Sequence, residues 1–259
     1  MISQSDIKRI RSLKSKKGRQ EHGQFMIEGY RLVKTYLENQ TGIIDVYYTK
    51  SFKQQHKRFN LLSKNSEKEL VLITEKLMSQ ISDAITPSGI ICICKTIRTP
   101  VPNFSAQTWL YLYQLSDPGN TGSLLRTAAW FNIKNIAFSP YSIDPFNPKV
   151  VRSAMGAHIH IDIHINMGLG QFQDNNYLTI GADQNGKEVI DQFVSLHKRV
   201  IVLGGEAHGI GQTIKHKLDK IVSVPKMGYG ESLNVAAAGA ILMNRLSKKQ
   251  NGTVILLPR

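Results

Sequence analysis

The chain of 259 residues is 41% hydrophobic, which suffices for one large domain or two ordinary domains with buried cores. Its 33 Lys and Arg residues exceed its 19 Asp and Glu residues and give a formal net charge of +14. It contains no apolar run near the roughly 20 residues that span a bilayer, and its start, MISQSDIKRIRS, lacks the residue order of a secretory signal peptide. We therefore expect a soluble cytoplasmic protein.

The positive charge is concentrated in residues 1–100, which hold 18 basic and 9 acidic residues. It peaks in KRIRSLKSKKGR, which contains no acidic residue. The cations of this basic segment are Lys8, Arg9, Arg11, Lys14, Lys16, Lys17 and Arg19. Because each neutralised phosphate releases counterions, such a cluster predicts a phosphate-binding arm. The alternative is a solvated, charged helix face.

Residues 1–98 show the mixed patterns of a small α/β domain. Helical spacing of apolar residues predicts a helix within residues 23–39, carried by Ile27, Tyr30, Leu32, Val33 and Leu37. Strands are predicted at 43–49, 69–74 and 89–95, with a helix at 74–82. Cys92 and Cys94 have a spacing that fits neither a redox pair nor half of a zinc site, so we interpret them as plain strand residues.

The second part of the chain begins after a linker at residues 99–107, which contains Pro100 and Pro102 and has no periodicity. Residues 108–259 then alternate between strands and helices, which predicts an α/β domain with a parallel sheet covered on both faces. We predict strands at 108–115, 135–138, 158–165, 177–182, 199–205 and 221–224, and helices at 121–131, around 147–154 and at 232–247. In such sheets, ligands bind beyond the carboxyl ends of the strands.

The loop after the first of these strands reads LSDPGNTGSLLRTAAWF. Asn120 is a good helix N-cap, and Gly122 allows close approach of another segment. Arg126 follows nearly two turns later, and its side chain can lean back over the loop because helical side chains tilt toward the N-terminus. An exposed arginine on the polar side of the helix is the alternative.

Two later loops also combine glycines with polar residues. VIVLGGEAHGIG places Gly204 and Gly205 directly after a strand, although it lacks the G-x-G-x-x-G spacing of a dinucleotide site. VPKMGYGESLNVAAAGAIL runs through Gly228 and Gly230 into a helix that Ser232 can cap. Since no G-x-x-x-x-G-K-[ST] motif occurs in the sequence, nothing in it supports nucleotide hydrolysis.

These three motifs, in this order and spacing, resemble the signature motifs of the SpoU/TrmH family of RNA ribose 2′-O-methyltransferases, in the SPOUT superfamily. VRSAMGAHI at 151–159 resembles a further element of the family. IKRIRSLKSKKGRQEHGQFMIEGYRLV and LITEKLMSQISDAITPSGIICICK resemble its RNA substrate-binding domain. The resemblance implies a C-terminal trefoil-knotted domain, a homodimer, S-adenosylmethionine as cofactor, and ribosomal or transfer RNA as substrate.

The resemblance also implies roles for individual residues. Those at positions that bind the cofactor are Gly204, Gly205, Val224, Met227, Gly228 and Leu233. The polar set around the reaction is Asn120, Arg126, Glu206, Ser232 and Asn234. The family's mechanism proposes that Arg126 acts as the base, but a guanidinium group stays protonated in proteins. We therefore expect Arg126 to position a phosphate and stabilise the emerging oxyanion, and we assign no residue to proton removal.

The sequence departs from the family pattern at several positions near the predicted site. These are Gly205, Ala207 and His208 in the second loop, Lys226 and Tyr229 in the third, and Ala154, which replaces a frequent serine. The departures leave the preferred nucleotide open. Two other functions also remain open: a non-catalytic RNA-binding or ribosome-assembly protein that retains the fold, and a base-methylating relative.

HIHIDIH suggests a strand with His158, His160, Asp162 and His164 on one face. Imidazole and carboxylate groups are metal ligands, but alternate residues of a strand lie about 6.6–6.8 Å apart and cannot converge on one ion unaided. We therefore expect a polar or RNA-facing strand and no metal site. His208 beside Glu206 could take part in acid–base chemistry, but a histidine in a loop is more often a surface residue.

Overall fold

The computed structural model describes residues 2–39, 42–56, 70–96, 101–187, 190–193, 198–205 and 209–247. The chain forms two compact units: residues 1–98 with 144–159, and residues 99–143 with 160–259. The segment 144–159 lies within the range expected for the C-terminal domain, but it packs with the first unit. Within the described part of the chain, no helix has the length and apolar character needed to cross a membrane.

The first unit is built on a four-stranded sheet in the order β1-β4-β2-β3. Its strands are β1 (Gln24–Glu28), β2 (Ile43–Thr49), β3 (Leu70–Ile73) and β4 (Ile90–Lys95). β4 is antiparallel to both neighbours, whereas β2 and β3 are parallel. The three strands predicted from the sequence are confirmed. The helical interpretation of residues 23–39 is wrong for its first part, because β1 comes first and the helix begins only after Gly29, whose φ is 107°.

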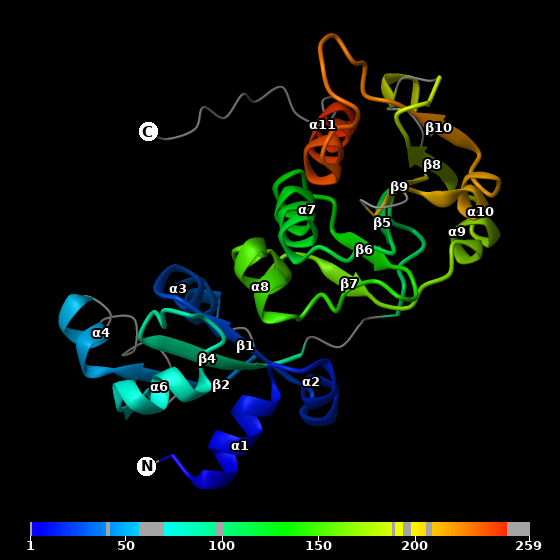
Figure 1. The fold of residues 1–259 in the computed structure, drawn as a ribbon. Coiled ribbons are helices and arrows are strands. Elements are labelled where there is room, and N and C mark those ends of the chain that lie inside the picture. Colours follow the sequence, from blue (N-terminus) through cyan, green and yellow to red (C-terminus); the bar gives the residue numbers. More distant parts are fainter. Residues whose placement is uncertain are drawn as a thin grey trace. The chain divides into compact units, whose positions relative to one another are not determined.

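Five helices of the described residues surround this sheet (Figure 1). They are α1 (Gln4–Ser12), α2 (Lys16–His22), α3 (Tyr30–Asn39), α4 (Lys50–Gln55) and α6 (Glu75–Ile81). Ile10 of α1 and Met78 of α6 join one apolar cluster on the sheet. Cys92 and Cys94 are buried in β4, as expected of plain strand residues, and burial raises the pKa of the Cys92 thiol.

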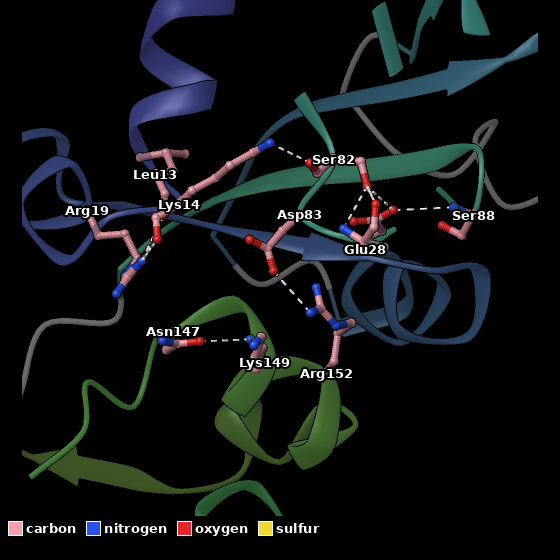
Figure 2. Close-up of polar contacts among 11 residues, drawn as sticks. Leu13, Lys14, Arg19, Glu28, Ser82, Asp83, Ser88, Asn147, Lys149 and Arg152 are labelled. Atoms are coloured by element: carbon pink, nitrogen blue, oxygen red, sulfur yellow. Dashed lines mark hydrogen bonds and ion pairs between the residues drawn. The ribbon is translucent and has the colours of Figure 1, made fainter. Parts of the chain in front are cut away.

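The segment 144–159 contributes α8 (Pro148–Ala154) and a short 3-10 turn, Ala157–Ile159, to the first unit. The ring centroids of Phe25 in β1 and Phe146 lie 5.1 Å apart. An ion pair of 3.0 Å joins Arg152 in α8 to Asp83 (Figure 2). Apolar packing and charge pairing therefore hold a segment from the middle of the chain on the first unit.

The second unit contains a six-stranded sheet in the order β10-β8-β9-β5-β6-β7. Its strands are β5 (Thr108–Tyr113), β6 (Asn135–Phe138), β7 (Asp162–His164), β8 (Leu178–Ala182), β9 (Arg199–Gly204) and β10 (Lys220–Val222). Every neighbouring pair is parallel. This confirms the predicted parallel sheet, and all the strands end at one edge.

Helices cover both faces of this sheet (Figure 1). One face carries α7 (Pro118–Trp130) and α11 (Val235–Ser247), and the other carries α9 (Gly170–Asp174) and α10 (Gly211–Lys215); a short 3-10 helix spans Ile190–Phe193. Gly239 brings α11 close to its neighbours, because an added Cβ would lie 2.4 Å from Leu124 and 2.8 Å from Leu203. On the other face, Phe172 of α9 packs with Trp109 and Tyr111 of β5.

The prediction of one strand through HIHIDIH is wrong. Residues 157–159 form the 3-10 turn of the first unit, and β7 spans only Asp162–His164. His158 is buried, and its Nε2 lies 2.8 Å from the carbonyl oxygen of Pro145. Packing of the 144–159 segment thus divides the histidines between two environments. Among the described residues, no group of three His, Cys, Asp or Glu side chains could hold a metal ion.

Candidate functional site

The carboxyl ends of β5 and β9 meet in a backbone contact that only glycine permits. The N–H of Gly205 donates to the carbonyl oxygen of Tyr113 at 3.1 Å. A Cβ on Gly205 would lie 2.7 Å from the carbonyl oxygen of Gln114, and one on Gly204 only 2.1 Å from the backbone of Gly209. Because neither position leaves room for a side chain, the loop after β9 folds back closely on the sheet edge.

A cavity of about 1010 Å³ opens at this edge, between the loops that follow β8, β9 and β10. All six residues expected at the cofactor line it: Gly204, Gly205, Val224, Met227, Gly228 and Leu233. Ser232 and Asn234, from the predicted polar set, line it as well. The cavity is as large as the pockets that hold cofactor-sized ligands, and glycine backbone forms part of its wall.

Asn234 connects this cavity to the loop after β5. Its Nδ2 donates to Oδ1 of Asn120 at 3.0 Å, and its Oδ1 accepts from the N–H groups of Ala236 at 2.9 Å and Ala237 at 3.3 Å. Asn234 therefore satisfies orphan donors in the first turn of α11 and also reaches the first turn of α7.

Both predictions of helix caps are wrong by a few residues. α7 begins at Pro118 with Asp117 as its N-cap, and Asp117 Oδ1 accepts from the N–H of Asn120 at 2.7 Å. α11 begins at Val235, so Ser232 lies ahead of the helix in the loop. The shift matters chemically, because the side-chain oxygen of Asn120 then accepts from Asn234, and Ser232 remains in the loop that lines the cavity.

Asn120 and Arg126, from the predicted polar set, are not among the residues that line the cavity. Arg126 is exposed on α7. Glu206, Ala207 and His208 lie outside the described residues. Their predicted roles, like those of Ser232 and Asn234 in the reaction, stay predictions.

The sequence analysis missed Asp183, an acidic residue of the cavity wall. It follows β8, and its carboxylate lies 2.6 Å from Nζ of Lys215. Burial opposes ionisation of Asp183, but the hydrogen bond and charge of Lys215, together with the N–H of Asn185, outweigh it and lower the pKa of the carboxyl group. A carboxylate in the cavity can accept hydrogen bonds from ligand hydroxyl or amino groups. The signal was available as GADQNG, an acidic turn directly after a predicted strand.

The basic segment divides into paired and exposed cations. Arg9 pairs with Asp6 and Asp45. Nζ of Lys14 donates to the carbonyl oxygen of Gln80 and to that of Ser82, the latter bond drawn in Figure 2. Arg19 is only 4% exposed. Its Nε and Nη2 lie 2.7 and 2.6 Å from Oδ2 of Asp144, and its Nη1 donates to the carbonyl oxygens of Leu13 and Lys14. The remaining members are exposed: Lys8, Arg11, Lys16 and Lys17.

Comparison with known proteins places this architecture in a family. Residues 107–244 match the SpoU rRNA Methylase family, and residues 4–92 match the MRM3-like substrate binding domain. The chain belongs to the SpoU rRNA methylase family. Among curated SpoU relatives, it is 29% identical over 249 residues to the 23S rRNA (guanosine(2553)-2'-O)-methyltransferase RlmP of Bacillus subtilis. That alignment covers 93% of this chain and 95% of RlmP.

Solved structures of SpoU-type proteins share the fold. A putative RNA methyltransferase of the TrmH family from Porphyromonas gingivalis superposes with a TM-score of 0.81 at 29% identity, covering 95% of this chain and 98% of that one. An AdoMet-bound rRNA methyltransferase from Sinorhizobium meliloti also gives 0.81, at 22% identity, covering 97% and 98% of the two chains. The second likeness concerns the fold alone.

Proposed function

We propose that this protein transfers the methyl group of S-adenosylmethionine to a ribose 2′-hydroxyl of RNA, with ribosomal RNA as the first candidate substrate. The observation that carries the proposal is the convergence of the loops after β9 and β10 on one cavity, with Asn234 bonded across to Asn120. Membership in the SpoU family and the similarity to RlmP support the same chemistry.

The cavity fits the proposed cofactor in size and chemistry. Its volume of about 1010 Å³ accommodates a nucleoside joined to an amino acid, and its wall combines glycine backbone with polar groups. Gly204 and Gly205 leave no space for a side chain, which keeps backbone donors and acceptors accessible. We propose that Gly204, Val224 and Leu233 hold the cofactor, and that Asp183 accepts hydrogen bonds from its hydroxyl or amino groups.

When bound, S-adenosylmethionine supplies a methyl group that its sulfonium has already activated. The protein must then orient the ribose hydroxyl, exclude competing geometries and stabilise the oxygen as it loses its proton. We assign orientation to Asn120 and Asn234, whose amides already meet at 3.0 Å. Arg126 carries a fixed positive charge on the exposed side of α7, where it can bind a phosphate and stabilise an oxyanion.

RNA binding in the first unit is assigned to the exposed half of the basic segment. Lys8, Arg11, Lys16 and Lys17 can each reach a phosphate without breaking a described internal bond. The substrate-binding domain that matches residues 4–92 supports the assignment. Because Arg9, Lys14 and Arg19 are paired within the unit, we expect them to support the arm and the other four to contact RNA.

We also propose that the protein is a homodimer with a trefoil knot in its second unit. The apolar residues Trp130 of α7 and Ile241 of α11 are 66% and 38% exposed, which suits a surface that a second copy covers. The close passage of Gly204 against the backbone of Gly209 and Ile210 suits a knotted segment. A ribosomal RNA substrate would place the protein in the cytoplasm.

Calorimetry with S-adenosylmethionine, followed by methyl transfer to in vitro transcribed 23S rRNA, tests the proposal. Arg126→Ala should lower kcat by about 100- to 1000-fold, as loss of an oxyanion-stabilising group does, and should leave cofactor affinity unchanged. Lys134→Ala, an exposed lysine between α7 and β6, is the matched control and should remain active. A wild-type protein that fails to bind the cofactor would favour a non-catalytic RNA-binding role. Equal turnover by Arg126→Ala would remove the role assigned to that residue.

A further inference from the structure

The loop after β6 presents an aromatic side chain in an unusual backbone conformation. Tyr141 has φ of 65° and its side chain is 92% exposed. A positive φ is a strained conformation for a bulky residue, whereas glycine or asparagine adopts it with ease. Exposure of the ring to water is also unfavourable, so neither folding nor local geometry accounts for a tyrosine at this position.

Hydrogen bonds fix this loop firmly on the end of β5. The N–H of Ser139 donates to the carbonyl oxygen of Leu112 at 3.0 Å, and the N–H of Ile143 donates to that of Leu115 at 2.8 Å. The Oγ of Ser142 donates to the carbonyl oxygen of Leu112 at 3.3 Å. Tyr141 therefore projects from a short loop whose backbone is anchored on both sides.

The same anchor connects Tyr141 with the candidate active site. The buried Oγ of Ser139 accepts from the N–H of Gln114 at 2.9 Å, and Gln114 itself has a positive φ of 49°. The carbonyl oxygen of Gln114 lies 2.7 Å from the position that a Cβ on Gly205 would occupy. The strands β6, β5 and β9 are neighbours in the sheet. Along the edge where they end, the loop of Tyr141 contacts Gln114, and Gln114 in turn lies against Gly205 of the cavity.

We propose that Tyr141 is a base-stacking residue that holds an unpaired nucleobase of the substrate RNA beside the candidate active site. The inference rests on the proposed function and adds a contact for the substrate. Single-stranded RNA is commonly held by stacking of bases on aromatic rings, and every base offers a flat apolar face. An exposed ring on an anchored loop suits such a contact, which positions the nucleotide and does not select among the bases.

The test uses four variants of the full-length protein. Tyr141→Asn removes the ring and suits the positive φ, Tyr141→Leu keeps an apolar side chain without a ring, and Tyr141→Phe and Tyr141→Trp keep a stacking surface. Methyl transfer to in vitro transcribed 23S rRNA gives KM and kcat. Fluorescence anisotropy with an unstructured RNA dodecamer gives affinity independently of catalysis. Calorimetry with S-adenosylmethionine measures cofactor affinity, and light scattering measures the oligomeric state.

We expect Tyr141→Asn and Tyr141→Leu to raise the KM for RNA and the Kd for the dodecamer by about tenfold, as loss of one stacked base does. Tyr141→Phe and Tyr141→Trp should stay near the wild type, and kcat and cofactor affinity should be unchanged in all four variants. Equal KM and Kd for wild type and Tyr141→Asn would overturn the proposal. So would a Tyr141→Leu variant as active as Tyr141→Phe, or an altered oligomeric state, since either result indicates an apolar protein contact.

The outcomes separate this inference from the proposed function. If the wild type transfers no methyl group to 23S rRNA, that substrate assignment fails. The dodecamer affinities of the same variants still decide whether Tyr141 stacks on RNA. If transfer occurs and all variants bind and react alike, the proposed function stands and Tyr141 has no stacking role.

Discussion

The basic segment of the first unit and the sheet edge of the second unit make opposite use of their polar residues. Arg9, Lys14 and Arg19 of the basic segment are bonded within their own unit. In the second unit, Ser232 and Arg126 are exposed, and the amide of Asn234 uses its oxygen to cap α11 and its nitrogen to donate to Asn120. Charge density in a sequence therefore overstates the number of cations left exposed, whereas Ser232 and Asn234, which lie beside glycines near a strand end, do line one cavity.

We expect the largest effect from loss of Arg19, because its buried guanidinium group is paired with Asp144 inside the first unit. Arg19→Met leaves the Asp144 carboxylate, which is 14% exposed, without its partner. Breaking a buried ion pair in this way costs about 3–5 kcal/mol, which chemical denaturation will measure. The control Lys16→Met removes an exposed cation three residues earlier in the same helix, α2, and should leave the free energy of unfolding nearly unchanged. Equal stability of both variants would contradict the internal role of Arg19.

The buried His158 should make the stability of the first unit depend on pH, which gives a second test of its internal polar groups. Burial lowers its pKa from 6.5 to about 4, against the opposing influence of the Pro145 carbonyl and Asp144. Between these values the unfolded chain binds more protons than the folded one, so stability rises with pH. The contribution of His158 to the free energy of unfolding is fully present above pH 6.5 and falls by about 3 kcal/mol as the pH drops to 4.

The variant His158→Gln isolates this contribution, since glutamine can still donate a hydrogen bond to the Pro145 carbonyl but does not titrate. Denaturation curves from pH 4 to 7 should show a shallower loss of stability for His158→Gln than for the wild type. Parallel profiles would mean that His158 does not remain neutral in the folded protein. Comparing the two proteins removes the contribution of carboxyl groups that titrate in the same range.

Gly204→Ala tests the sheet edge, where close backbone contact replaces charge pairing. The added Cβ would lie 2.1 Å from the backbone of Gly209, so the loop must move. A misplacement of about 1 Å can cost an enzyme about 100-fold in rate, and we expect Gly204→Ala to lower both methyl transfer and affinity for S-adenosylmethionine, the rate by about that factor. Gly168→Ala is the matched control, because an added Cβ there meets no atom within 4 Å. Unchanged cofactor affinity in Gly204→Ala would place the cofactor elsewhere.

The smallest effect concerns the exposed cations of the basic segment. Lys16→Ala combined with Lys17→Ala should weaken RNA binding and reduce the slope of log K against log salt concentration by about 0.7–0.9 for each lost phosphate contact. Filter binding at several salt concentrations measures this slope. The control pair Lys50→Ala and Lys76→Ala removes exposed lysines from α4 and α6 of the same unit and should leave the slope unchanged. Equal slopes for both pairs would argue against a phosphate-binding arm.

Most strands were predictable because their apolar runs are short, rich in β-branched residues and bounded by turns. Residues 23–39 misled the analysis because the apolar residues of β1 and α3 together imitate one helical stripe across Gly29. HIHIDIH misled it because alternation of polar and apolar residues appears at a position where the chain changes units. Periodicity reports local burial and carries no information on which unit a segment packs against.

The candidate site was predictable in its loops and less so in its contacts. Gly204, Gly205 and Leu233 could be selected by motif, and they do line one cavity. Asp183 lies outside the three motifs and reaches the cavity because β8 ends beside β9 and β10. The position of Arg126 on an exposed surface likewise depends on how α7 packs.

The sequence by itself determined the α/β class, the parallel sheet, the glycine-rich turns at its carboxyl edge and membership in a methylase family. Only the tertiary structure decided which cations remain exposed, that residues 144–159 pack with the first unit, and that Asn234 bonds Asn120. The physical reason is the range of the interactions involved. Propensity and periodicity act between residues a few positions apart, whereas ion pairs such as Arg19 with Asp144 form between residues 125 positions apart, once packing has brought them together.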